Sequence, residues 1–173
     1  MRLTDVAQAD APARTAFSRT ELASLTELLR MLSRRAFTGA RLTRAAEHVH
    51  QAGCDPEAGD LGGSAAFMAY ALATELAEQM ASSESLAELH GQVSGLLARP
   101  LPPARESADA AGGYFAWLDA QLAERQRDWG GLAAMAMELG IDTRLRLLLV
   151  FRSDLPRILS LARGLRLPIA CTT

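Results

Sequence analysis

Apolar residues at helical spacing constrain the fold of this chain more than any other feature of its sequence. Ser18 and Glu21 form a capping box, the pattern with which a helix often begins. The leucines that follow recur every three or four residues and would line one helical face: Leu22, Leu25, Leu28, Leu29 and Leu32. Comparable patterns predict four further helices over residues 40–52, 65–80, 85–98 and 107–129.

The last third of the chain is harder to assign from periodicity. We expect helices over residues 132–139, 143–152 and 156–163. Leu145–Phe151 is also compatible with a strand, because a short apolar run fits a buried strand as well as a buried helix. No other segment offers this run a partner strand, so a helix is favoured. The sequence therefore predicts an all-α protein, a single-domain bundle of about six to eight helices with short connecting loops.

The same patterns suggest three parts of the chain. We expect a flexible N-terminal arm over residues 1–16, a helical domain over residues 17–165 and a C-terminal tail over residues 166–173. A weak similarity between residues 62–103 and 130–170 leaves an internal duplication open, and the Ala- and Leu-rich composition leaves chance open as well.

Charge is distributed in blocks along the chain. Residues 1–45 carry eight Arg and four acidic residues, whereas residues 46–98 carry eight acidic residues and no Arg. Residues 99–173 are basic again, with ten Arg and eight acidic residues, and the whole chain has a net charge of -2. This pattern suggests that the acidic centre packs against the basic ends, and drift on solvated helix faces is an equally good interpretation.

Several classes of partner and compartment are disfavoured. The net charge of -2 argues against general affinity for nucleic acid. The longest apolar run, Ala65–Ala73, is far shorter than a membrane span, and the first residues lack the apolar stretch of a signal peptide. Cys54 and Cys171 are too few for a disulfide framework. We therefore expect a cytoplasmic protein with no membrane partner.

A cluster of aromatic residues is the strongest functional signal. Within sixteen residues the chain places Tyr114, Phe115, Trp117 and Trp129, four of its nine Phe, Tyr and Trp residues, with Arg125 between the two tryptophans. Trp117 lies off the helical face that would hold Tyr114 and Trp129, so the aromatic coverage is wide. Aromatic residues and Arg are enriched at protein interfaces, although burial in an ordinary core explains the same residues.

His90 is the candidate ligand-binding residue. It ends the segment Leu86-Ala-Glu-Leu-His, which resembles the proximal-histidine helix of globins, and Phe37 lies 53 residues upstream, near the spacing of a globin's haem-packing Phe. That resemblance implies a haem with His90 as its axial ligand. The segment Ala87–Gly95 is also similar to a short motif of YecA/YgfB-type proteins. A hydrogen-bonded histidine on a half-buried helix is the alternative that requires no ligand.

Two further patterns are weaker. Glu47 and His50 have the spacing of a di-iron ligand pair, but no second such pair exists, so we expect no metal site. Residues 132–149 resemble a helix-turn-helix, yet the second helix is too apolar to lie in a DNA groove.

We therefore expect a non-enzymatic helical module that binds another protein, as an adaptor, a regulator or a dedicated chaperone. We expect it to act as a homodimer and to need no cofactor. The alternatives are a helical ligand or haem sensor that uses His90 and, third, a DNA-binding regulator.

Overall fold

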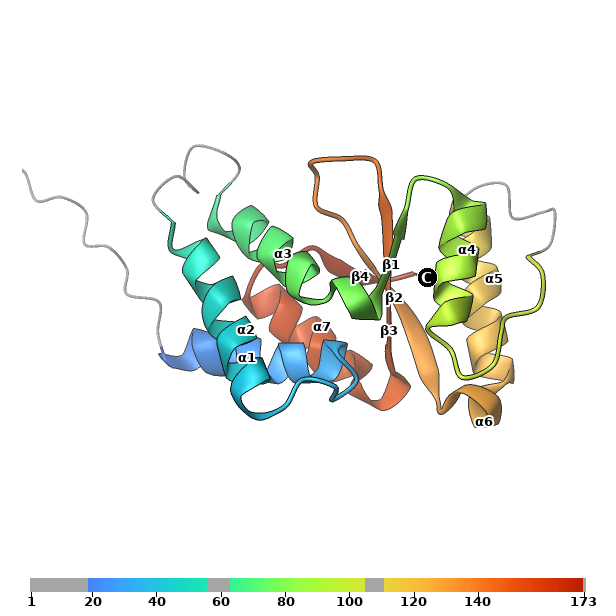
Figure 1. The fold of residues 1–173 in the computed structure, drawn as a ribbon, viewed down its shortest axis with the longest axis horizontal. Coiled ribbons are helices and arrows are strands. Elements are labelled where there is room, and N and C mark those ends of the chain that lie inside the picture. The colour runs from blue at the N-terminus through green and yellow to red at the C-terminus, as the bar shows by residue number, and fades with distance from the viewer. Residues whose placement is uncertain (1–18, 56–62, 105–110, 173) are drawn as a thin grey trace, which may run out of the picture.

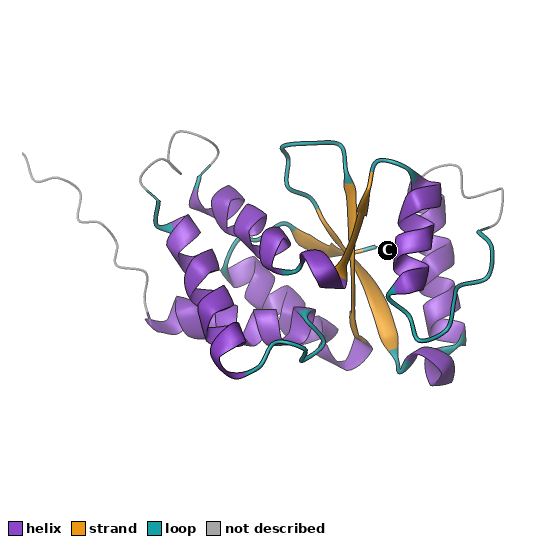
Figure 2. Ribbon diagram, in the orientation of Figure 1, coloured by secondary structure: helices purple, strands orange, loops and turns teal. Residues whose placement is uncertain are grey.

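A four-stranded antiparallel sheet lies at the centre of the protein (Figures 1 and 2). The computed structural model describes residues 19–55, 63–104 and 111–172. The prediction of an all-α bundle was wrong, because helices cover a sheet instead of packing only on each other. The fold is of the α+β class.

Seven α-helices surround the sheet in the described part of the chain. They are α1 (Arg19–Leu32), α2 (Gly39–Gly53), α3 (Ser64–Glu75), α4 (Leu86–Gly95), α5 (Ala111–Glu124), α6 (Gln126–Trp129) and α7 (Leu155–Gly164). Two short 3-10 turns accompany them, η2 (Ala77–Gln79) and η4 (Arg152–Asp154). The helices expected over residues 40–52 and 156–163 are confirmed as α2 and α7.

The strands follow the order β1-β3-β2-β4 across the sheet. Their bounds are β1 (Met80–Ser83), β2 (Leu132–Met137), β3 (Leu145–Phe151) and β4 (Ile169–Cys171). β2 and β3 form the central hairpin, in which Ala134 lies opposite Leu149. β1 flanks β3, and β4 flanks β2. β4 arises within residues 166–173, the segment expected to be a tail.

Burial on both faces explains why the central strands were predicted as helices. An exposed sheet face produces alternation of apolar and polar residues, and β3 has none because helices cover both of its sides. β2 reads Leu-Ala-Ala-Met-Ala-Met, residues that favour helices when taken alone. Tertiary packing overrides that preference. The helix-turn-helix resemblance over residues 132–149 is also lost, because this segment is a β-hairpin.

Two crossovers determine which helices cover which face. The chain passes from β1 to β2 through α4, α5 and α6, and from β3 to β4 through α7. The first crossover passes over β3 and the second over β2, both in the same direction across the sheet. Because β1 and β3 point in opposite directions, crossovers of the same hand must lie on opposite faces. Figure 1 shows this arrangement, with α4 and α5 on one side of the sheet and α7 on the other.

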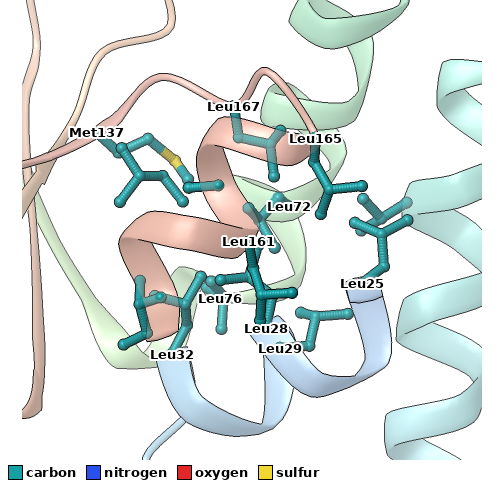
Figure 3. Close-up of a cluster of buried hydrophobic side chains, with 14 of the residues drawn as sticks. Leu25, Leu28, Leu29, Leu32, Leu72, Leu76, Met137, Leu161, Leu165 and Leu167 are labelled. Carbon is teal, nitrogen blue, oxygen red and sulfur yellow. The ribbon is translucent and has the colours of Figure 1, made fainter. Parts of the chain in front are cut away.

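Each face of the sheet has its own hydrophobic core. One core joins Leu148 and Met135 of the sheet to α1, α2, α3 and α7, and Figure 3 shows its leucine-rich centre. The other joins Leu147 and Leu149 to α4, α5 and α6. Successive residues of β3 therefore enter different cores, as the two-residue repeat of a strand requires.

Some sequence-based expectations lie outside the described residues, namely the N-terminal arm over residues 1–16, the capping residue Ser18 and the start of the helix expected from Ser107. The proposed repeat gains no support, because residues after 63 form the helix α3 whereas residues after 131 form the strand β2. None of the described helices is long and apolar enough to cross a lipid bilayer.

Two surface ion pairs join the acidic middle of the chain to its basic ends. Arg41 lies 3.3 Å from Glu78, and Arg144 lies 3.7 Å from Glu84. All four side chains are more than half exposed, so each pair contributes little stability in water. The charge blocks are thus complementary at these two points without holding the fold together.

Candidate functional site: a groove between the two helical layers

The expected aromatic surface is divided between two places in the structure. Three of its residues, Tyr114, Phe115 and Trp117, lie on α5 and form a cluster with His90 of α4. The ring of His90 has its centroid 6.0 Å from that of Tyr114 and 5.6 Å from that of Trp117. Tyr114 is almost fully buried, so this cluster mainly joins two helices of one layer.

The contact between His90 and Tyr114 is partly buried. The Tyr114 hydroxyl lies 3.4 Å from Nδ1 of His90, a distance at the limit of a hydrogen bond. Burial lowers the pKa of His90 below its usual 6.5 and raises the pKa of Tyr114 to about 12. Both groups are therefore favoured in their neutral forms at neutral pH. His90, the residue expected to bind a ligand, thus lies in contact with two aromatic rings of its own chain, and its binding of a ligand stays a prediction.

Trp129 and Arg125 lie elsewhere, around α6. The indole Nε1 of Trp129 donates a hydrogen bond to the backbone carbonyl of Arg99 at 3.0 Å. The guanidinium of Arg125 lies over the indole ring, 5.7 Å from its centroid. Asp128 pairs with the side chain of Arg99 at 3.0 Å. These contacts fix Trp129 at the end of the sheet where β2 begins.

A groove of about 540 Å³ opens at this end of the sheet. It runs between the two helical layers, with the α1–α2 connection and η2 on one side and the segment after α4, together with α6, on the other. We call it the Arg34 groove. Its lining residues are Ser33, Arg34, Ala36, Glu78, Gln79, Ala98, Asp128, Trp129, Gly130, Leu132 and Phe151.

Arg34 is the charged group that distinguishes the groove. Its side chain is half-buried, and Nη1 donates a hydrogen bond to the carbonyl of Leu96 at 3.3 Å. Burial lowers the pKa of the guanidinium below its usual value. A partly desolvated cation is normally paired with a carboxylate, yet the contacts of Arg34 in the described part of the chain include no ion pair. Within the described residues, the groove thus contains a cation that forms no ion pair.

The backbone at Arg34 is strained. Arg34 has φ 52° and Arg35 has φ 65°, so two consecutive residues with side chains adopt the left-handed conformation. A residue with a Cβ pays about 1 kcal/mol for this conformation, and glycine is the usual choice after a helix end. The turn is held by the amide of Arg35, which bonds to the carbonyl of Arg30 at 2.8 Å. A similar turn follows α7, outside the groove, where Arg166 has φ 57° and the amide of Leu167 bonds to the carbonyl of Ala162 at 2.8 Å, so the turn is a way of ending a helix and does not by itself mark a site.

One wall of the groove contains an unsatisfied polar atom. Oε1 of Gln79 is shielded from solvent and has no hydrogen-bond partner in the described part of the chain. Buried amide oxygens are nearly always hydrogen-bonded in folded proteins. Among the described residues, the lining of the groove therefore includes a cation without an ion pair and a buried amide oxygen without a hydrogen-bond partner.

Sequence reasoning identified one side of this groove and missed the other. Trp129 and Arg125 stood out as aromatic and basic residues, but Arg34 lay beside several other arginines with nothing to mark it. The helix was expected to continue to Phe37 and to end at Gly39, so Arg34 and Arg35 were placed inside it, whereas α1 ends at Leu32.

The Glu47–His50 segment lies on α2, away from the groove residues. The neighbouring His48 contacts Glu75, with Nδ1 and Oε1 2.6 Å apart. Among the described residues, no three His, Cys, Asp or Glu side chains are close enough together to hold a metal ion.

Comparison of the chain with protein-family models, with curated proteins and with solved structures gave no match.

Proposed function

We propose that this chain is a non-enzymatic protein-binding module and that a segment of its partner docks in the Arg34 groove. The observation that carries the proposal is the half-buried Arg34 guanidinium, which has no ionic partner among the described residues although it lines an open groove. Trp129, Leu132 and Phe151 supply aromatic and apolar lining beside it. Arg and Trp are the residues that most often dominate binding energy at protein interfaces.

The size of the groove supports a segment rather than a whole domain as the bound element. A volume of about 540 Å³ is within the range of sites that enclose a drug-sized ligand or a few side chains.

Site-specific crosslinking in the producing cells tests this proposal. A photoreactive amino acid is placed at Ala36 or Ala98, two exposed positions that line the groove. Matched controls carry it at Ala23 of α1 and Ala123 of α5, which are exposed outside the groove, one on each helical layer. We expect one protein to be crosslinked from both groove positions and from neither control. Equal crosslinking from all four positions would contradict the proposal.

The crosslinked protein, once identified and purified, permits a quantitative test. Removing a charged hydrogen-bonding group at an interface costs about 1.5–3 kcal/mol. The Arg34→Gln variant should therefore bind the partner roughly 10- to 100-fold more weakly in isothermal titration calorimetry. An unchanged affinity would exclude Arg34 as an anchor.

The homodimer expected from the sequence remains a prediction, but one reason for it has gone. The apolar faces of the first and last helices suggested a surface for a second copy. In the structure α1 and α7 pack on each other within one chain, and Arg157 forms a two-bond ion pair with Glu27. Light scattering on a sizing column measures the oligomeric state directly.

We propose the cytoplasm as the compartment. Both cysteines are free, which fits a reducing environment. Fractionation of the producing cells, with a cytoplasmic enzyme as the marker, tests this assignment.

A further inference from the structure

The charges around the Arg34 groove indicate the chemistry of its occupant. Two carboxylates line the groove, and both already have basic partners: Glu78 lies 3.3 Å from Arg41, and Asp128 lies 3.0 Å from Arg99. Neither has a contact with Arg34 among the described residues. The local acidic groups therefore leave the charge of Arg34 uncompensated.

Two more arginines increase the positive charge near the groove. Arg125 lies over the ring of Trp129, and Arg35 lies over the ring of Phe151 at 5.1 Å from its centroid. Arg35 also pairs with Asp154, whereas no ion pair of Arg125 is present in the described residues. Among the described residues, Arg34 in the lining and Arg125 beside Trp129 therefore lack an acidic partner, whereas the two lining carboxylates, Glu78 and Asp128, are each paired with an arginine.

Arg34 also has donors to spare. A guanidinium carries five N–H donors, and the described contacts of Arg34 use one of them, toward the carbonyl of Leu96. Guanidinium and carboxylate groups match in shape and can form two parallel hydrogen bonds. One such pair would neutralise Arg34 and satisfy two further donors.

We infer that the segment bound in the Arg34 groove is acidic and that one of its carboxylates pairs with Arg34. This inference rests on the proposed function, because it names the chemistry of the docked protein segment. The aromatic and apolar lining from Trp129 and Phe151 favours an acidic residue flanked by apolar ones. It does not favour a polyanion, which would need a row of cations along the groove.

Two matched synthetic peptides test the charge preference. One is acetyl-Leu-Glu-Phe-Glu-Leu-amide, and the other has Gln in place of both Glu residues. Each is titrated into the full ¹⁵N-labelled chain, and the Nε–Hε signal of Arg34 and the backbone amides of Ala36 and Ala98 are followed by NMR. We expect the Glu peptide to bind at least tenfold more tightly than the Gln peptide and to shift all three signals.

Two variants connect the preference to one side chain. Arg34→Gln should abolish the difference between the peptides. Arg163→Gln removes an exposed arginine at the end of α7, outside the groove, and should leave the preference unchanged. The NMR spectrum of each variant shows at the same time whether it is folded.

Each other outcome overturns the inference. If both peptides bind with equal affinity, the groove does not discriminate between charged and neutral side chains. The inference is then wrong, although the proposed function is not contradicted. If neither peptide binds, the acidic preference fails while the crosslinking from Ala36 and Ala98 tests the function separately. If inorganic phosphate alone shifts the Arg34 signal as much as the Glu peptide does, the site is a general anion site.

Discussion

Leu147 and Leu148 are neighbours in sequence, but their side chains enter different hydrophobic cores. Both are fully buried, Leu147 against α4, α5 and α6, and Leu148 against α1, α2, α3 and α7. Leu149, two residues after Leu147, enters the same core as Leu147. Truncation of these three residues therefore tests the sheet and its two cores in one experiment.

The cost of each single truncation follows from complete burial. A Leu→Ala change at a fully buried site costs about 2–5 kcal/mol, from lost transfer free energy and from the cavity that remains. We expect about 3 kcal/mol for each of the three variants. For a domain of this size, that corresponds to a fall in Tm of roughly 6–12 °C.

The coupling between pairs of truncations carries the decisive information. In a strand, Leu147 and Leu148 point in opposite directions, so their costs should add to within about 0.5 kcal/mol. Leu147 and Leu149 share a core, so their double variant should depart from additivity by more than about 0.5 kcal/mol. In a helix, adjacent residues lie about 100° apart and residues two apart lie about 200° apart, so the order would be reversed.

Urea unfolding followed by circular dichroism measures all six free energies of unfolding, those of the parent, three single variants and two double variants. If a double variant does not fold, the same cycles are run with Leu→Val changes. Each of these removes one buried methylene and lowers the free energy of unfolding by about 0.8 kcal/mol. Stronger coupling for the 147/148 pair than for the 147/149 pair would refute the two-core sheet.

Two further changes have outcomes that the structure defines. The side chain of Arg146 forms two hydrogen bonds with Asp142, at 2.7 and 2.5 Å, and these hold the pKa of Asp142 at about 2, below its usual 3.8. The stabilisation is complete above about pH 5 and is lost progressively as the pH falls through 3.8 toward 2. Asp142→Asn should therefore flatten the acid-unfolding curve in that window, and an unchanged curve would contradict the pairing. Gly53→Ala would place a Cβ 2.6 Å from Cγ of Met68 and should lower the free energy of unfolding, measured in urea, by about 1 kcal/mol. Gly91→Ala has open space around its new Cβ and should raise the free energy of unfolding by about 0.5–1 kcal/mol. Equal effects of the two changes would contradict the close contact at Gly53.

The helices of the fold could be predicted from sequence where one helical face is solvated. The leucines of α1 and the Asp154–Pro156 start of α7 lie in such helices, and the apolar spacing revealed them. β2 and β3 gave no comparable signal, because both of their faces are covered and alternation is lost. A remaining clue was length, since two apolar runs of six and seven residues are separated by a turn at Gly140.

The groove could be predicted only in part for a related reason. Trp129 is rare enough in composition to stand out, whereas Arg34 is one of 18 arginines. What distinguishes Arg34 is its hydrogen bond to the carbonyl of Leu96, 62 residues later in the chain. Such a long-range relationship depends on the sheet topology, which the sequence patterns did not reveal.

The hydrogen bond from Arg34 to the carbonyl of Leu96 also connects the two sides of the molecule mechanically. Arg34 follows α1 in one helical layer, and Leu96 follows α4 in the other. If this hydrogen bond were broken, the two layers would depend on their remaining contacts at that edge. An occupant that pairs with the other donors of Arg34 would leave this hydrogen bond in place, whereas one that displaced the Leu96 carbonyl would remove one contact between the two layers at that edge.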